Sequence, residues 1–139
     1  VVFFGAVDNP MFKFRALLIT AIFLTPFGAV AQDAKPFVKT RNSVDGTAQL
    51  TTTEVGTRLE FSEDFKTKNG PDLKVYLTPK SIDNLTVKDV EAQSIKIGVL
   101  IANQGAQSYV IPADIDLSQY KSVVIQCEAF SVLWGGFDL

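Results

Sequence analysis

The chain contains one cysteine, Cys127, and no histidine among its 139 residues. A thiol can exchange with a disulfide, transfer electrons or ligate a cofactor, so Cys127 is the candidate atom for redox chemistry. The lack of histidine excludes Ser-His-Asp and Cys-His catalytic arrangements and every metal site that depends on imidazole ligands. Any chemistry must therefore use this sulfur or oxygen-containing side chains.

Cys127 lies in the apolar run 123–130, whose side chains alternate between two faces if the run forms a strand. On this pattern Cys127 shares the core face with Val123 and Ile125, whereas Glu128 lies on the other face. A core environment disfavours the reactive thiolate, and no basic residue lies within three positions to offset this effect. Two interpretations stay open, a redox or ligating thiol and a cysteine that fills the core. A bulge just after Cys127 would reverse the face assignment.

Residues 1–31 predict an export signal. A short basic stretch after Met11 is followed by the apolar run 16–30, and the small-x-small pattern of a cleavage site ends at Ala31. The apolar run is shorter than the roughly 20 residues that span a bilayer. We therefore expect translation to start at Met11, cleavage after Ala31, and a secreted or periplasmic mature domain, residues 32–139, without a membrane span.

Few prosthetic groups remain compatible with residues 32–139, which contain neither methionine nor histidine. Haem could be held only by Cys127 or by a tyrosine, namely Tyr76, Tyr109 or Tyr120. Iron–sulfur clusters lack enough thiolates, and a blue-copper site lacks its histidines. The cofactor thus stays open between haem and none.

Other binding functions have weaker signals. The four aromatic residues Tyr76, Tyr109, Tyr120 and Trp134 could form a carbohydrate-stacking platform, although packing within sheets is their commoner use.

Residues 114–118 resemble the opening of a calcium loop but lack its later glycine and glutamate, so we interpret them as an acidic turn capped by Asp116 or Ser118 and expect no metal. A net charge of −2 without a basic stripe argues against a nucleic-acid partner.

Alternation of apolar and polar residues with period two dominates residues 32–139. The clearest runs are 59–61, 73–78, 95–99 and 123–130, and turn-forming residues separate them, at 45–46, 69–72, 103–105 and 112–116. Only residues 81–92 could be helical, as a short helix or a long loop. The pattern predicts a single all-β domain after the signal peptide, a small antiparallel β-sandwich or barrel of about seven to eight strands.

Three motifs, in order, resemble the DM-thirteen domain, also called the electron-transfer DM domain. They are Gly70-Pro71-Asp72-Leu73-Lys74-Val75-Tyr76-Leu77, Gly105-Ala106-Gln107-Ser108-Tyr109-Val110-Ile111-Pro112 and Tyr120-Lys121-Ser122-Val123-Val124-Ile125-Gln126-Cys127. The resemblance runs from about residue 37 to residue 139. Gln126 stands where family members often carry tryptophan, and Trp134 stands where phenylalanine is usual.

The resemblance implies a secreted or cell-surface β domain whose one characteristic cysteine, matching Cys127, acts in redox transfer as a bare thiol or by holding a group such as haem. We therefore expect an exported electron-transfer or accessory redox domain that works with a redox partner protein and is not a stand-alone enzyme. The alternative is a non-catalytic periplasmic or cell-surface binding module in which Cys127 fills the core.

Overall fold

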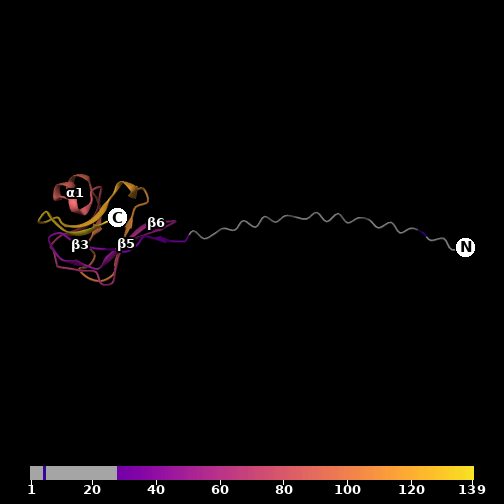
Figure 1. Cartoon of the computed structure of the whole chain (residues 1–139), viewed down its shortest axis with the longest axis horizontal. Helices are drawn as coiled ribbons and strands as arrows, with labels where there is room; N and C mark the ends of the chain where they lie inside the picture. The colour runs from indigo at the N-terminus through magenta and orange to yellow at the C-terminus, as the bar shows by residue number, and fades with distance from the viewer. Residues whose placement is uncertain (1–4, 6–27) are drawn as a thin grey trace.

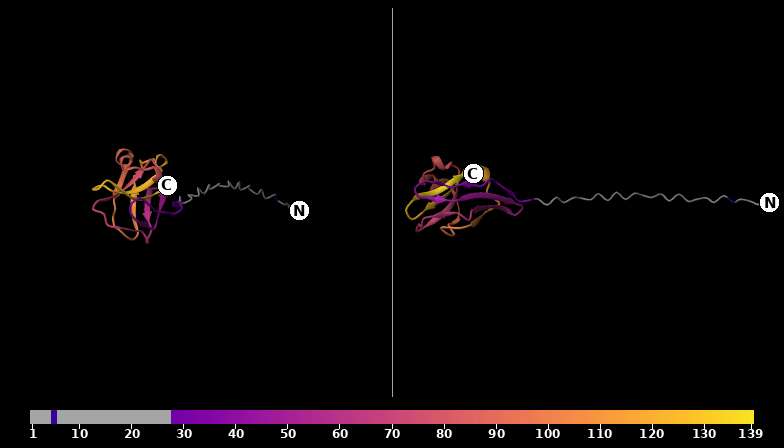
Figure 2. Two further views of the ribbon diagram at one scale, coloured as in Figure 1. Left: turned by 60° about the vertical axis from the view of Figure 1, so that its left-hand side comes forward. Right: turned by 60° about the horizontal axis from the view of Figure 1, so that its bottom comes forward.

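The computed structural model describes residues 28–139 and Gly5, and its fold is all-β, as the sequence predicts. Two antiparallel sheets, called sheet A and sheet B, pack face to face as a sandwich (Figures 1 and 2). Of the predicted signal peptide, which runs from Met11 to Ala31, only residues 28–31 lie within the described part of the chain. No helix in the described part of the chain is long and apolar enough to cross a bilayer.

Sheet A has the strand order β1-β5-β6-β10, and β2 pairs with the same edge of β5. Leu50 lies opposite Leu59, which in turn lies opposite Tyr109, so one row of large side chains crosses the inner face. The strands are β1 (Val30–Ala31), β2 (Lys35–Pro36), β5 (Thr47–Thr53), β6 (Gly56–Phe61) and β10 (Gln107–Ile111).

Sheet B has the strand order β3-β12-β11-β8-β9, and β4 pairs with β7 in a separate two-stranded sheet. The strands are β3 (Val38–Lys39), β4 (Val44–Asp45), β7 (Lys66–Thr67), β8 (Leu73–Thr78), β9 (Ile95–Val99), β11 (Ser122–Cys127) and β12 (Val132–Asp138). In the described residues, seven strands have five residues or more, in agreement with the predicted seven or eight, and the others have two.

A bulge in β12 changes which residues face the core. Ile125 lies opposite Gly135 and Gln126 opposite Leu133, so Trp134 is an extra residue in β12. Trp134 consequently enters the core between the sheets, whereas Leu133 packs on the outer face of sheet B. Because the extra residue is in β12 and not in β11, the alternation along β11 is preserved.

The core between the sheets is built around aromatic side chains. Phe61 packs edge-on against Phe37, with ring centroids 5.0 Å apart, and lies 4.8 Å from Phe65 and 5.4 Å from Tyr109. Phe137 of β12 joins the same cluster through Phe37, at 5.4 Å. Rings contributed by both sheets therefore fill the sandwich and hold the sheets together.

The outer face of sheet B carries a second, smaller core beneath helix α1 (Val87–Gln93) and the 3₁₀ helix η1 (Ile82–Asn84). These helices occupy the segment 81–92 for which the sequence allowed a helix or a loop. Thr86 begins α1 with a reciprocal capping box to Asp89, and Val90 then packs on this face together with Tyr76. Figure 1 shows α1 on the side of the sandwich opposite β5 and β6.

Candidate functional site

Cys127 is a free cysteine at the last position of β11, and its side chain has no exposed surface. It lies opposite Leu73 of β8 and Val132 of β12, and it belongs to the core between the sheets. The strand alternation therefore placed Cys127 on the correct face. A thiol in this closed position is shielded from water and from reagents, so its reactivity stays a prediction.

Cys127 is nevertheless close in the chain to a surface turn. Residues 128–131 connect β11 to β12, and Phe130 at this turn is 69% exposed. Ser131 closes the turn with φ +49°, in the left-handed region that L-residues adopt at a cost. The pair formed by Cys127 and Val132 is the last of the β11–β12 ladder, and Val132 is itself only half-buried.

The aromatic residues proposed as a carbohydrate platform do not form one. Tyr76, Tyr109 and Trp134 are all buried, in two different cores, and Tyr120 is half-buried. The Nε1 of Trp134 donates to Thr67 Oγ1 at 2.8 Å inside the sandwich. Packing within the sheets, which the sequence analysis gave as the commoner use of these residues, is confirmed, because the rings supply the apolar area that a small sandwich needs in its interior.

A polar cluster that sequence analysis did not single out lies on the outer face of sheet B. The hydroxyl of Tyr76 donates to Glu128 Oε1, and Lys96 Nζ lies 2.6 Å from the same oxygen. Lys74 Nζ pairs with Asp72 and lies 3.9 Å from Glu128 Oε2. The sequence indicated that Glu128 faces away from the core, but only the register between β8 and β11 brings it to Tyr76.

The electrostatics of this cluster have clear causes. The hydrogen bond from Lys96, followed by the one from Tyr76, lowers the pKa of Glu128 below its ordinary value. Burial, followed by the hydrogen bond to Glu128, raises the pKa of Tyr76. A protonated phenol therefore faces an ionised carboxylate at neutral pH.

Comparison with protein families covers the sandwich from the end of β2 onwards. A family model described as Electron transfer DM13 matches residues 36–139. The chain belongs to the DM13 family. Searches of curated proteins and of solved structures each found no match. The resemblance seen in the three sequence motifs is thus confirmed, and the family description suggests electron transfer with a redox partner.

Three of the four candidate haem ligands of the DM13 domain, Cys127, Tyr76 and Tyr109, are not placed to hold a haem in the folded arrangement. A haem ligand must face a cavity that holds the macrocycle, whereas Cys127 is enclosed by core side chains. The hydroxyl of Tyr76 is engaged with Glu128, and that of Tyr109 donates to Gln107 Oε1 at 2.6 Å. We therefore assign no chemical step to haem.

The acidic segment 114–118 of the DM13 domain forms a turn, as the sequence predicts. Asp116 begins the 3₁₀ helix η2 (Leu117–Gln119), and its carboxylate accepts from Ser118 N at 3.0 Å and from Ser118 Oγ at 2.7 Å. Its hydrogen bonds with Ser118 and Gln119 lower the pKa of Asp116. The segment therefore serves as a helix cap.

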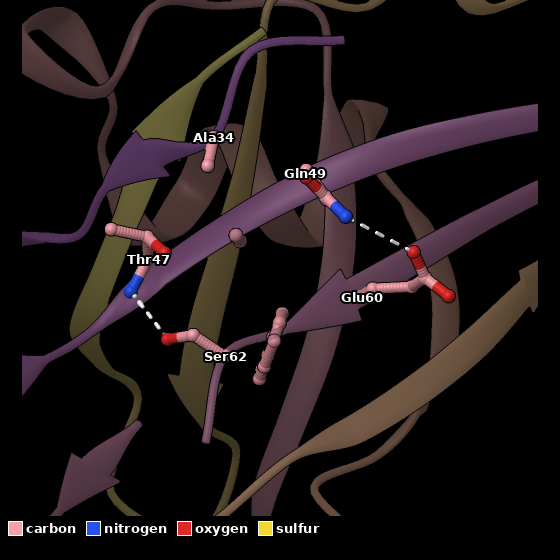
Figure 3. A pocket seen from close by; sticks show the side chains of 7 residues that line it. Ala34, Thr47, Gln49, Glu60 and Ser62 are labelled. Carbon is pink, nitrogen blue, oxygen red and sulfur yellow. Dashed lines mark hydrogen bonds between the residues drawn. The ribbon is translucent and has the colours of Figure 1, made fainter. Parts of the chain in front are cut away.

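A shallow pocket of about 150 Å³ lies over β5 and β6 of the DM13 domain (Figure 3). Gln49 Nε2 donates to Glu60 Oε2 at 3.3 Å, and Thr47 N donates to Ser62 Oγ at 2.8 Å, so polar groups of the lining already satisfy one another. Its volume is below the roughly 300–1,000 Å³ typical of ligand sites. Cys127 is not among the residues that line it.

Within β11, Gln126 is the residue whose buried side-chain amide oxygen lacks a hydrogen-bond donor. It is 2% exposed on the outer face of sheet B, and its Oε1 atom has no hydrogen-bond partner. A buried amide oxygen without a donor costs roughly 1–3 kcal/mol of stability.

Replacing Gln126 by methionine, which has a similar shape, should raise the free energy of unfolding of the DM13 domain by about 1 kcal/mol. The midpoint and slope of urea unfolding measure this change. Gln93→Met on exposed α1 is the matched control and should leave stability within about 0.5 kcal/mol of the parent. A loss of stability in Gln126→Met would show that the amide oxygen has a partner in solution.

Proposed function

We propose that this DM13 domain is an exported redox domain that exchanges electrons with a partner protein through Cys127, and that opening of the β11–β12 end controls access to the thiol. The observation that carries the proposal is the position of the only cysteine, at the last residue of β11 beside an exposed turn. Membership of an electron-transfer family supports it.

The place of Cys127 at the end of its strand makes such opening feasible. The ends of sheets open more readily than their centres, because fewer hydrogen bonds and apolar contacts must be broken. Separation of the terminal pair Cys127–Val132, together with residues 128–131, would expose the sulfur while the central part of β11 stays paired with β8. The left-handed backbone of Ser131 weakens this end of the ladder.

The exchange itself follows thiol–disulfide chemistry. Once exposed, Cys127 loses its proton to water, and the thiolate attacks one sulfur of a disulfide in the partner protein. A bond forms between the two sulfurs, the partner's S–S bond breaks, and its second sulfur leaves as a thiolate. Because this chain has a single cysteine, a thiol of a third molecule must release Cys127 by attacking the partner's sulfur in the mixed disulfide. That thiol is oxidised into a new disulfide with the partner and Cys127 leaves as a thiolate, so two electrons pass from the external thiol to the partner's original disulfide.

Thiol-labelling kinetics test this proposal. We expect Cys127 in the folded domain to react with an aromatic disulfide reagent at least about 100-fold more slowly than in the denatured chain, because opening must precede reaction. The rate should nevertheless exceed the rate set by global unfolding, and it should change little at low urea concentrations. Weak dependence on urea identifies a small local opening.

A buried cysteine in the centre of sheet B is the matched control. Val75 is fully buried in β8, so a Cys127→Ala, Val75→Cys variant should label only when the whole domain unfolds. If Cys127 is labelled at the same rate and with the same urea dependence as this control, the proposal that local opening of the β11–β12 end exposes the thiol is wrong.

The second candidate function is a non-catalytic binding module, which the complete burial of Cys127 favours. In this case the thiol fills the core and a Cys127→Ala variant keeps every interaction with its partner. Labelling of Cys127 that occurs only through global unfolding would support this candidate.

A further inference from the structure

Tyr76 differs from the other tyrosine whose hydrogen bond is described, because its hydroxyl donates to a carboxylate. Tyr109 donates instead to the amide oxygen of Gln107, at 2.6 Å. A carboxylate can take a proton at neutral pH, whereas an amide oxygen cannot. Tyr76 is also only 9% exposed, so its ring has a fixed position, whereas the side chain of Glu128 is 29% exposed and can pass a proton on to solvent.

Two lysines keep the acceptor ionised. Lys96 Nζ is 2.6 Å from Glu128 Oε1 and 5.7 Å from the centre of the Tyr76 ring, and Lys74 Nζ is 3.9 Å from Glu128 Oε2. The pKa of Glu128 is lowered and that of Tyr76 is raised, so the proton resides on the phenol before any oxidation. A phenol that has lost an electron is a far stronger acid than the neutral phenol, and the hydroxyl of Tyr76 already donates to the Glu128 carboxylate. Loss of an electron from this ring therefore requires loss of the phenol proton.

We propose that Tyr76 and Glu128 form a proton-coupled one-electron relay on the outer face of sheet B. One electron passes from the Tyr76 ring to a high-potential one-electron oxidant, which is thereby reduced. At the same time the O–H bond of Tyr76 breaks, and its proton moves to Glu128 Oε1. The products are a neutral phenoxyl radical and a protonated carboxyl group, and the return of one electron from a reductant restores both residues.

The relay goes beyond the proposed thiol exchange, which moves electrons in pairs at the opposite face of the sheet. It does not require Cys127, since Tyr76 lies in the outer core whereas Cys127 lies between the sheets. A Cys127→Ala variant therefore tests the relay whether or not the thiol is active.

The experiment uses photogenerated tris(bipyridine)ruthenium(III) as the one-electron oxidant of the full chain and of its variants. In Cys127→Ala we expect the visible band and the electron paramagnetic resonance signal of a tyrosyl radical. Adding Tyr76→Phe should remove most of this signal, whereas adding Tyr120→Phe should leave it unchanged. Retention of the tyrosyl signal in the Tyr76→Phe variant, or an indolyl radical of Trp134 in place of the tyrosyl radical in Cys127→Ala itself, would overturn the proposal.

Glu128→Gln separates a proton acceptor from a structural hydrogen bond. Glutamine keeps the size of the side chain but cannot accept the proton, so radical formation should slow by about tenfold or more. With Glu128 the rate should be independent of pH near neutrality, because the carboxylate is ionised throughout this range. With glutamine the rate should rise with buffer concentration, because the proton must leave to the solvent.

Circular dichroism and urea unfolding establish that each variant is folded before oxidation. If folded Glu128→Gln gives the same rate and the same pH profile as the parent, Glu128 serves only to position Tyr76, and the relay is wrong. Thiol labelling of the parent domain reports separately on Cys127, so failure of one proposal does not affect the other.

Discussion

Replacing Gly136 by alanine should lower the free energy of unfolding by about 3 kcal/mol or more, because the added methyl group has no space. A Cβ atom at this position would overlap the carbonyl oxygen of Val123 and would lie 2.8 Å from Ile82 Cδ1 and 3.0 Å from Val124 Cα. Two of these neighbours are backbone atoms of the central strand β11, which cannot move without breaking the ladders to β8 and β12. Urea or thermal unfolding followed by circular dichroism measures the loss.

The matched control for this substitution is Gly98→Ala in the edge strand β9. A Cβ atom there would meet Tyr109 Cδ1 at 3.5 Å, which is an ordinary van der Waals distance. We expect its stability to stay within about 1 kcal/mol of the parent. A mild effect of Gly136→Ala, similar to that of the control, would mean that β11 and β12 are less closely packed than described.

Replacing Phe65 by alanine should cost about 3–5 kcal/mol, close to the entire stability of a small domain. Phe65 is 1% exposed, and its ring lies 4.8 Å from Phe61 and 5.3 Å from Phe37. Its removal leaves a cavity beside the rings of Phe61 and Phe37, and a close-packed core fills such a cavity only in part. The expected result is a large fall in the urea midpoint or a domain that does not fold.

Phe130→Ala provides the control of the same chemistry, because this ring is 69% exposed on the β11–β12 turn. Its effect on the free energy of unfolding should stay within about 0.5 kcal/mol. Equal effects of the two substitutions would contradict the placement of one phenylalanine in the core and the other at the surface.

At the candidate site, the sequence predicted which face of β11 carries Cys127 but not where the neighbouring strand has a bulge. Period two alone placed Cys127 with Val123 and Ile125 on the core face, because neighbouring residues of a strand point to opposite sides. The sequence could not establish whether a bulge interrupts this alternation. The bulge lies in β12 at Trp134, and its position depends on the pairing of two strands.

For the aromatic residues, by contrast, the sequence did not establish whether the side chains are buried or exposed. The residue types alone allowed an exposed platform as well as the commoner packing in a core, since a tyrosine or tryptophan can pack with its polar atom bonded or exposed. Tertiary contacts decided between the two uses. Trp134 donates a hydrogen bond to Thr67 and Tyr109 donates one to Gln107, so neither ring leaves a polar atom unpaired when it is buried.

The sequence by itself determined the all-β class, the turns, the membership of the DM13 family and the single thiol, because each depends on local patterns or on composition. Only the tertiary structure decided how deeply Cys127 is enclosed and that Tyr76 meets Glu128. Both depend on strand register, which joins residues about fifty positions apart in the chain and leaves no local trace.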